Sequence, residues 1–394
     1  MNPPQVAGRL PLVGFYFLYF GAIGVTLPFL PAYLRSLELS TTQVGFLLSL
    51  GPLASLLTPP LWGHLADRTG RLSHVLTLLT VGSALCFAPL LGVTAFPALA
   101  LTLAAYACFA SSITPVVDSL TLNRVNLLGG SYSHVRLFGS LGFILFSTTF
   151  GLVSKEMSRL AVAVPLALLV LLALWSLSLR SGASPGTSHH PLAGLRLLRD
   201  NTDLRWLLAA TCLHWMACAP YNGMLAIHIL GQGMPPWVVG LAAGVGVAAE
   251  VPAMILYPRF AHRIAPRHLL GVAFGLSALR WVGMSLVSSP TLLVGLSVLH
   301  SMTFGVFYVA SVAFMARRVP PHLRASGQGL FAAMTFGVGG LLGNMLSGAG
   351  FHLLGGHALF AVAGLLEVVA VLLVLQSSPA PLPPSNEPVH VPAP

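Results

Sequence analysis

The stretch LPLVGFYFLYFGAIGVTLPFLPAYL, residues Leu10–Leu34, contains no charged side chain. A helix rises ~1.5 Å per residue, so this run is long enough to cross the ~30 Å hydrocarbon core of a bilayer. The apolar region of a cleavable signal peptide is shorter, and further apolar runs follow, so we expect an uncleaved signal anchor. The stretch therefore predicts the first of several transmembrane helices.

The rest of the chain has the same character. Of its 394 residues 56% are hydrophobic and 7% are charged, with a mean hydropathy of +0.85. A soluble protein carries about 25% charged residues, so we predict an all-α polytopic membrane protein. Breaks at glycine, proline and charged residues divide it into twelve spans, arranged as two pseudo-symmetric six-helix bundles. The predicted spans are residues 10–34, 41–62, 73–92, 96–121, 132–153, 159–179, 204–230, 236–257, 268–288, 291–316, 324–347 and 356–376.

Polar interruptions set the predicted domains and topology. Residues 1–180 form the N-terminal bundle and residues 204–376 the C-terminal bundle, joined by a cytoplasmic linker at 181–203. The proline-rich tail, 377–394, is expected to be disordered. Most of the 19 basic residues fall in the N-terminal tail and the even-to-odd loops. Because positive loops stay inside, both termini are predicted to be cytoplasmic, in a plasma (inner) membrane.

Five ionisable residues lie inside the predicted spans and form two groups: Asp118 with Arg136, and Glu250 with Arg280 and His300. A charge in mid-bilayer costs at least ~2.5–3.5 kcal/mol on insertion scales, so such residues usually face a partner or a watery cavity. Members of the second group each lie ~10–14 residues into their spans, in the central layer where transporter sites lie. The alternative is static ion pairs that fix helix packing.

The segment GHLADRTGR, Gly63–Arg71, follows the second predicted span and resembles the signature of the major facilitator superfamily. Its glycines permit a tight turn, and an acid among arginines can form a reversible charge cluster. A plain basic loop that sets topology is the alternative interpretation. The resemblance implies that the segment latches the cytoplasmic side, with gating residues Gly63, Asp67, Arg68, Gly70 and Arg71.

Further stretches extend the resemblance to nearly the whole chain. They are similar to the phenylpropionate-permease and lactose-permease-like branches of the superfamily, which are mostly proton symporters of small organic solutes. The stretches are residues 16–21, 59–63, 136–143, 300–307 and 324–329.

The lactose-permease-like branch also implies roles for the charged residues. There an acid on span four and an arginine on span five bind the sugar, and Asp118 and Arg136 are similarly placed. A glutamate, an arginine and a histidine on spans eight, nine and ten serve proton coupling and substrate contact. The residues that match in span and order are Glu250, Arg280 and His300.

This chain departs from that branch at Thr303, where the sugar permeases carry a proton-binding glutamate one turn after the histidine. The acidic and lysine partners on spans seven, ten and eleven are also missing. Neither sugar specificity nor that proton relay is therefore implied here. The resemblance predicts substrate binding by Asp118, Arg136, Arg280 and His300, and proton coupling by Glu250, Arg280 and His300.

Other polar residues in the spans have no assigned role. Glu367 lies on the last span, an outer helix that often faces lipid, without an obvious cationic partner. The seventh and first spans hold polar-aromatic sets that either line a cavity or pack: His214, Trp215, Tyr221, Asn222 and His228, and Tyr16, Tyr19 and Tyr33.

Together these features predict a secondary active transporter, a proton-coupled symporter of a sugar, nucleoside or aromatic carboxylate that works by alternating access. The alternatives are a proton-driven efflux antiporter for sugars or drugs and, in another class, a non-transporting receptor or scaffold. No catalytic order, phosphate-binding loop or metal-ligand spacing indicates an enzyme, a cofactor or a metal site. The expected partners are the solute, protons and lipid, with no nucleic acid, and the expected state is a monomer.

Overall fold

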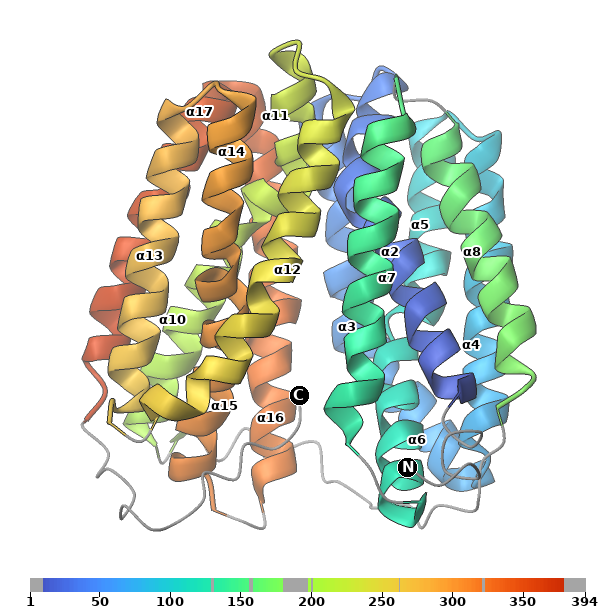
Figure 1. Cartoon of the computed structure of the whole chain (residues 1–394), viewed down its shortest axis with the longest axis horizontal. Coiled ribbons are helices and arrows are strands. Elements are labelled where there is room, and N and C mark those ends of the chain that lie inside the picture. The colour runs from blue at the N-terminus through green and yellow to red at the C-terminus, as the bar shows by residue number, and fades with distance from the viewer. Residues whose placement is uncertain are drawn as a thin grey trace. The chain divides into compact units, whose positions relative to one another are not determined.

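The computed structural model describes residues 10–128, 131–155, 159–179, 198–199, 201–261, 263–320 and 323–378. All regular secondary structure in these ranges is helical (Figure 1). By their contacts the residues form two compact units, Met1–Ser188 with Pro235–Gly244 and His189–Met234 with Val245–Pro394. Most of the predicted linker and tail, residues 180–197 and 379–394, lies outside the described residues.

The helices of the first unit follow one another with short connections. Ser40 caps the helix that starts at Thr41 with a capping box, in which the side chains of Ser40 and Gln43 each bond the other residue's backbone N–H. The helices are α2 (Leu10–Ser36), α3 (Thr41–Thr69), α4 (Leu72–Phe87), α5 (Phe96–Ala110), α6 (Ile113–Leu128), α7 (Tyr132–Val153) and α8 (Leu160–Ser176).

Helices α2 and α7 pack backbone to backbone through glycines. A Cβ atom on Gly142 would lie 2.2 Å from the carbonyl oxygen of Phe17, and one on Gly24 would lie 2.6 Å from that of Phe143. No side chain fits at these distances, so the glycines allow the close approach that drives helix association in lipid. This contact fixes the register of the two helices that carry half of the first unit's charged site.

In the second unit several helices begin at a proline, a residue suited to the first helical turn. Its helices are α10 (Thr202–Ala219), α11 (Leu225–Gly231), α12 (Pro236–Ala261, whose opening residues belong to the first unit), α13 (Pro266–Leu286), α14 (Pro290–Leu296), α15 (Phe307–Arg318), α16 (Arg324–Ala332) and α17 (Gly340–Leu375).

Irregular turns interrupt the second unit's helices. Wider π-helical turns occupy Pro220–Met224, Ser301–Val306 and Ala333–Gly339. Gly355, at φ 75° and ψ 174°, breaks α17 into two helices. Such π-turns are often found at functional sites. The described part of the first unit contains none.

These helices form the twelve predicted spans, with ends that differ by a few residues in most cases. Nine stretches within the described ranges are long and apolar enough to cross a membrane, and one of them, Ser326–Leu375, contains the break at Gly355. The shorter Leu160–Ser176 and the interrupted pair α10 and α11 supply the others. The predicted fold class is therefore confirmed.

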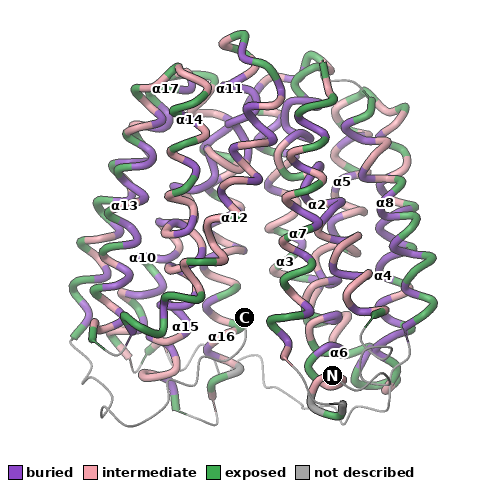
Figure 2. Tube along the Cα trace, in the orientation of Figure 1, coloured by how far each residue is buried: buried purple, intermediate pink, exposed green. Residues whose placement is uncertain are grey.

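Many exposed side chains of the helices are large and apolar, as a lipid environment requires. Leu101 and Leu353, for example, are 74% and 78% exposed. Exposed positions recur along the outer sides of helices such as α8 and α13, while buried positions lie between neighbouring helices (Figure 2). A soluble protein would seldom leave so many large apolar side chains uncovered.

Candidate functional site

The first unit brings Asp118 and Arg136 together, as predicted. Arg136 Nη1 lies 3.1 Å from Asp118 Oδ1 and 3.3 Å from Oδ2, and the side chains are 30% and 24% exposed. Tyr16 Oη, from α2, donates to the same Oδ1 over 2.5 Å. The carboxylate is thus held by one charged and one neutral donor, from two different helices.

Aromatic rings surround this guanidinium. Its central carbon lies 4.8 Å from the ring centre of Phe20 and 5.7 Å from that of Tyr16, within the range of cation–π attraction. Arg136 Nη1 also lies 3.4 Å from the hydroxyl oxygen of Tyr132, one turn earlier on α7. Tyr16 and Tyr132 therefore belong to the site, whereas Tyr19 and Tyr33 bond backbone carbonyls and pack.

The second unit brings Glu250, His300 and Arg280 together. Glu250 lies on α12 and Arg280 on α13, while His300 lies on the span that contains α14 and α15. His300 Nε2 lies 3.0 Å from Glu250 Oε1, and His300 Nδ1 lies 3.1 Å from Arg280 Nη1. Because a guanidinium only donates, Nδ1 accepts and Nε2 carries the hydrogen that bonds Glu250. In this arrangement His300 is neutral and lies between an acidic and a basic side chain.

Arg280 is the unusual member of this cluster. It is completely buried, yet its Nε and Nη2 have no hydrogen-bond partner among the described residues. Its guanidinium carbon lies 4.0 Å from the ring centre of Tyr221 and 4.6 Å from that of Trp281. Leaving buried charged donors without hydrogen-bond acceptors costs free energy of folding. The arrangement suits a molecule that brings oxygen acceptors to this guanidinium.

Two glycines let the helices of this cluster meet. A Cβ on Gly246 of α12 would lie 3.2 Å from the Cβ of His300, and one on Gly305 would lie 3.6 Å from the Cγ of Glu250. Gly305 lies in the π-helical turn Ser301–Val306, which starts directly after His300. The turn and the glycines together place the imidazole against the carboxylate.

The sequence shows no obvious cationic partner for Glu367, but the structure pairs it with a histidine. Glu367 is fully buried on α17, and its Oε2 lies 2.8 Å from Nδ1 of His214 on α10. Trp281 Nε1 donates to Glu367 Oε1 over 3.0 Å. The sequence does not reveal a partner 153 residues away. Of the seventh-span set, His214 and Tyr221 thus join charged groups, while His228 lies beside Gln232.

Glu367, His214 and Cys218 have ligand atoms within 4.8 Å of one another, as a metal site would require. The Cys218 sulfur lies 3.7 Å from His214 Nε2, on the other side of the ring from Glu367. Both ring nitrogens already face protein oxygens, at Glu367 and at the main chain of Thr303. The cluster is satisfied as a hydrogen-bonded pair without an ion.

The predicted gating segment differs from expectation in its secondary structure. Gly63–Thr69 continue helix α3 beyond its predicted end, so the prediction of a loop is wrong for these residues. Only Gly70, with φ 63°, makes the turn. The last two turns expose polar side chains, which suit a helix end that projects beyond the apolar span. Asp67, Arg68 and Arg71 are exposed, and Asp67 forms no ion pair with any described residue.

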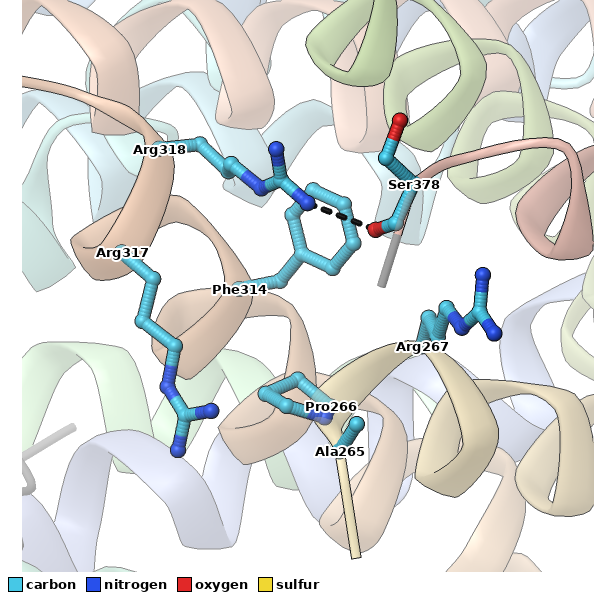
Figure 3. Close-up of a pocket in the computed structure, with 7 residues that line it drawn as sticks. All are labelled: Ala265, Pro266, Arg267, Phe314, Arg317, Arg318 and Ser378. Carbon is cyan, nitrogen blue, oxygen red and sulfur yellow. Dashed lines mark hydrogen bonds between the residues drawn. The ribbon is translucent and has the colours of Figure 1, made fainter. Parts of the chain in front are cut away.

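A small basic pocket lies at one end of the second unit (Figure 3). Arg318 forms an ion pair with Asp203 and donates to the carbonyl oxygen of Ser378, and Arg267 donates to that of Ser377. The arginines are thus used to join the end of α15 to the starts of α10 and α13 and to the chain that leaves α17. This junction is a structural contact rather than the solute site.

Comparison with known proteins agrees with this picture. Residues 10–362 match the sequence profile described as the MFS_1 like family. The chain belongs to this family, within the major facilitator superfamily. It is 29% identical to the maltose permease of Geobacillus stearothermophilus, over 92% of each chain, and 29% identical to the probable 3-phenylpropionic acid transporter of Escherichia coli (strain K12), over 91% of this chain and 95% of the relative.

Solved structures show the same fold. The crystal structure of the nucleoside transporter NupG superposes with a TM-score of 0.84 at 20% identity, covering 95% of this chain and 98% of that one. The predicted superfamily is confirmed. The protein is a multi-pass membrane transporter of small molecules, and its relatives are transporters rather than enzymes.

Proposed function

We propose that this protein is a proton-coupled symporter of a small organic solute, a sugar, nucleoside or aromatic carboxylate, that works by alternating access. The observation that carries the proposal is Arg280, which is buried beside Glu250 and His300 with two nitrogens that have no partner among the described residues. The named relatives, a maltose permease and a probable 3-phenylpropionic acid transporter, support the solute classes.

Coupling follows from the charges of the cluster. With Glu250 ionised, its charge balances that of Arg280 across the neutral His300. When Glu250 takes up a proton, Arg280 is left as an unbalanced buried cation, which favours the arrival of a carboxylate or hydroxyl oxygen. Loss of the proton restores the internal pairing and releases the solute. Proton and solute are then bound and released together, as symport requires.

The first unit holds a second charged group that suits a solute. Asp118 and Arg136 offer an acceptor and a donor at about one quarter exposure, framed by Tyr16 and Phe20. A sugar presents hydroxyl groups to such a pair and an apolar ring face to aromatic side chains. We assign Asp118, Arg136, Arg280 and His300 to the solute, and Glu250, Arg280 and His300 to the proton.

We further propose that the transporter is a monomer in the plasma (inner) membrane with both termini cytoplasmic. The distribution of basic residues supports this orientation. The bundles 1–180 and 204–376 would alternate, and the segment Gly63–Arg71 would gate the cytoplasmic side. Reporter fusions after residue 376 and in the predicted external loop at 155–159 should be active on opposite sides of the membrane.

Proteoliposomes test the function directly. Maltose, uridine and 3-phenylpropionate are offered with an inward proton gradient, an outward gradient, or a protonophore. Symport predicts accumulation only with the inward gradient; accumulation driven by the outward gradient instead indicates the antiporter. Arg280→Gln should abolish uptake, whereas Arg267→Gln, which removes an arginine bonded to a backbone carbonyl away from the cluster, should not. Uptake unaffected by Arg280→Gln would remove the proposed site.

A further inference from the structure

A second acid of the second unit, Glu367, is fully buried and paired with two side chains. Its carboxylate oxygens lie 2.8 and 2.9 Å from His214 Nδ1, and Oε1 also accepts from Trp281 Nε1. All three side chains are completely buried. An unpaired carboxylate in such a place would be very costly, so the pairing is required for this residue to exist there at all.

The hydrogen bonds determine how many protons the pair holds. His214 Nε2 lies 2.9 Å from the main-chain oxygen of Thr303, which can only accept, so Nε2 carries a hydrogen. One further proton must lie between Nδ1 and Glu367, as imidazolium with carboxylate or as imidazole with carboxylic acid. Both forms are neutral overall. Losing that proton would set a carboxylate against a ring lone pair.

The pair is sealed as well as neutral. The His214 ring lies 4.7 Å from the ring of Phe274 and 4.3 Å from that of Phe307, centre to centre. Both phenylalanines are fully buried in the main apolar cluster of this unit. These two ring contacts are apolar, and the polar partners of the pair are themselves buried, so the pair is suited to keeping its proton rather than exchanging it.

His214 also completes the π-helical turn Ser301–Val306. In an α-helix the N–H of Phe307 would donate to the carbonyl of Thr303, but here it donates to Met302 and Phe304. The Thr303 carbonyl is thereby freed from this partner and accepts from His214 instead.

The contacts of Thr303 and Trp281 lead from this pair to the charged cluster. Thr303 Oγ1 accepts from Arg280 Nη1 over 3.4 Å, and Thr303 lies three residues after His300. Trp281, held by Glu367 at its Nε1, presents its ring to the same guanidinium. Glu367 is therefore connected to Arg280 indirectly, once through His214 and Thr303 and once through Trp281.

We propose that Glu367, His214 and Trp281 form a sealed, neutral positioning network that holds the π-helical turn 301–306 and so sets His300 and Arg280 for solute binding. The inference rests on the proposed function only in assigning His300 and Arg280 to the solute. Glu367 and His214 are positioning residues and carry no transported proton.

Paired substitutions at Glu367 test the network. In Glu367→Gln the amide can donate to His214 Nδ1 and accept from Trp281, so every hydrogen bond survives without a titratable group. In Glu367→Leu the hydrogen bonds to His214 and to Trp281 are both lost. Counterflow is measured with whichever of maltose, uridine or 3-phenylpropionate the parent transports. Its half-saturation concentration should change less than about twofold in the first variant. In the folded fraction of the second it should rise about tenfold or more.

A readout without solute keeps the test independent of the proposed function. In protein labelled with ¹⁵N-histidine, the ring signals of His300, assigned from His300→Asn, should shift in Glu367→Leu and stay in place in Glu367→Gln. If Glu367→Leu does not fold, Trp281→Phe replaces it. That variant keeps an aromatic ring near Arg280 and removes only the donor, with an expected shift in the same direction of about two- to threefold in half-saturation.

His228 provides the matched control. It is a buried histidine on the same span, but its hydrogen-bond partner is Gln232 and its ring contacts are with Phe351, His357 and Phe360. His228→Leu should lower the melting temperature without changing half-saturation, whereas His214→Leu should change both. Two results overturn the proposal. One is a folded Glu367→Leu with normal half-saturation and unshifted His300 signals. The other is a Glu367→Gln that keeps counterflow but loses proton-driven accumulation, since Glu367 would then carry a proton itself.

Discussion

The two carboxylate–histidine pairs of the second unit have the same chemistry in opposite surroundings. His300 and Glu250 are 19% and 13% exposed, and the histidine's second nitrogen faces a cation, Arg280. His214 and Glu367 are 0% exposed, and the second nitrogen there faces a main-chain carbonyl. A cation forces the first imidazole to be neutral, while the carbonyl obliges the second pair to keep a proton.

This difference separates what a proton can do in each place. In the proposed mechanism Glu250 gains a proton while His300 still donates to it, so the pair passes between two charge states. The Glu367 pair has only neutral arrangements. Burial alone therefore does not identify a coupling residue. Whether a buried acid can exchange a proton depends on the hydrogen-bond chemistry of its partner and on the access of the pair to water.

Glu250→Gln is expected to have the largest effect, and it tests directly whether the two carboxylate–histidine pairs differ in function. Proton-driven accumulation should be abolished, falling about 100-fold to the equilibrium distribution, because an amide cannot exchange the proton. Counterflow should remain measurable, since exchange needs no net proton movement. Uptake and counterflow in proteoliposomes measure both, with Glu367→Gln as the matched change in the sealed pair. Parental accumulation by Glu250→Gln would remove this residue from coupling.

Asp118 and Arg136 extend the comparison to a third pair, which is more exposed than either of the others. Asp118→Ala and Arg136→Ala each strand a charge and should cost about 1–3 kcal/mol of stability, below the ~3–5 kcal/mol of a fully buried pair. The double variant should regain thermal stability, because no charge is left alone.

Transport by that double variant then separates the two roles of the pair. A solute-binding pair predicts a stable protein that neither binds nor transports. A merely structural pair predicts that stability and transport return together. Melting temperatures with and without solute, measured beside uptake, distinguish these results, and normal transport would leave Glu250, Arg280 and His300 as the only supported site.

Arg280→Lys sharpens the comparison within the accessible cluster. Lysine keeps the positive charge that balances Glu250 but loses the planar donor fork and its stacking on Tyr221 and Trp281. The half-saturation concentration should therefore rise about tenfold, while the pH gradient still drives what uptake remains. A variant with normal half-saturation but no accumulation would instead assign Arg280 to the proton alone.

The sequence was sufficient for the spans and for the residues with charges in unusual places. Apolar runs have the length of the bilayer, so the predicted ends at Leu10 and Val153 match those of α2 and α7. Asp118, Arg136, Glu250, Arg280 and His300 stand out because charge inside such runs is rare. That α3 continues through Gly63–Thr69 was missed, because exposed polar residues fit a loop and a helix equally well.

The partner of Glu367 could not be predicted. Nothing near Glu367 indicates His214, because the contact depends on how α10 and α17 pack. For Tyr16 and Tyr221 the sequence left cavity lining and packing open, since an aromatic ring at helical spacing serves either purpose. The π-helical turn Ser301–Val306 also has no recognisable pattern in the sequence. Its geometry depends on a hydrogen bond from another helix.

Asp67→Asn is expected to have the smallest effect, and it tests whether charges outside the spans act like those inside. Asp67 is exposed and has no ion-pair partner among the described residues, so the variant should keep the parent's melting temperature. If the segment Gly63–Arg71 latches the cytoplasmic side in another state of the cycle, losing this carboxylate should favour inward-facing states. Transport should then fall a few-fold while solute binding changes little. Distances between spin labels on the two predicted cytoplasmic halves measure the shift directly, and a distribution equal to the parent's would mean that Asp67 is only a solvated surface charge.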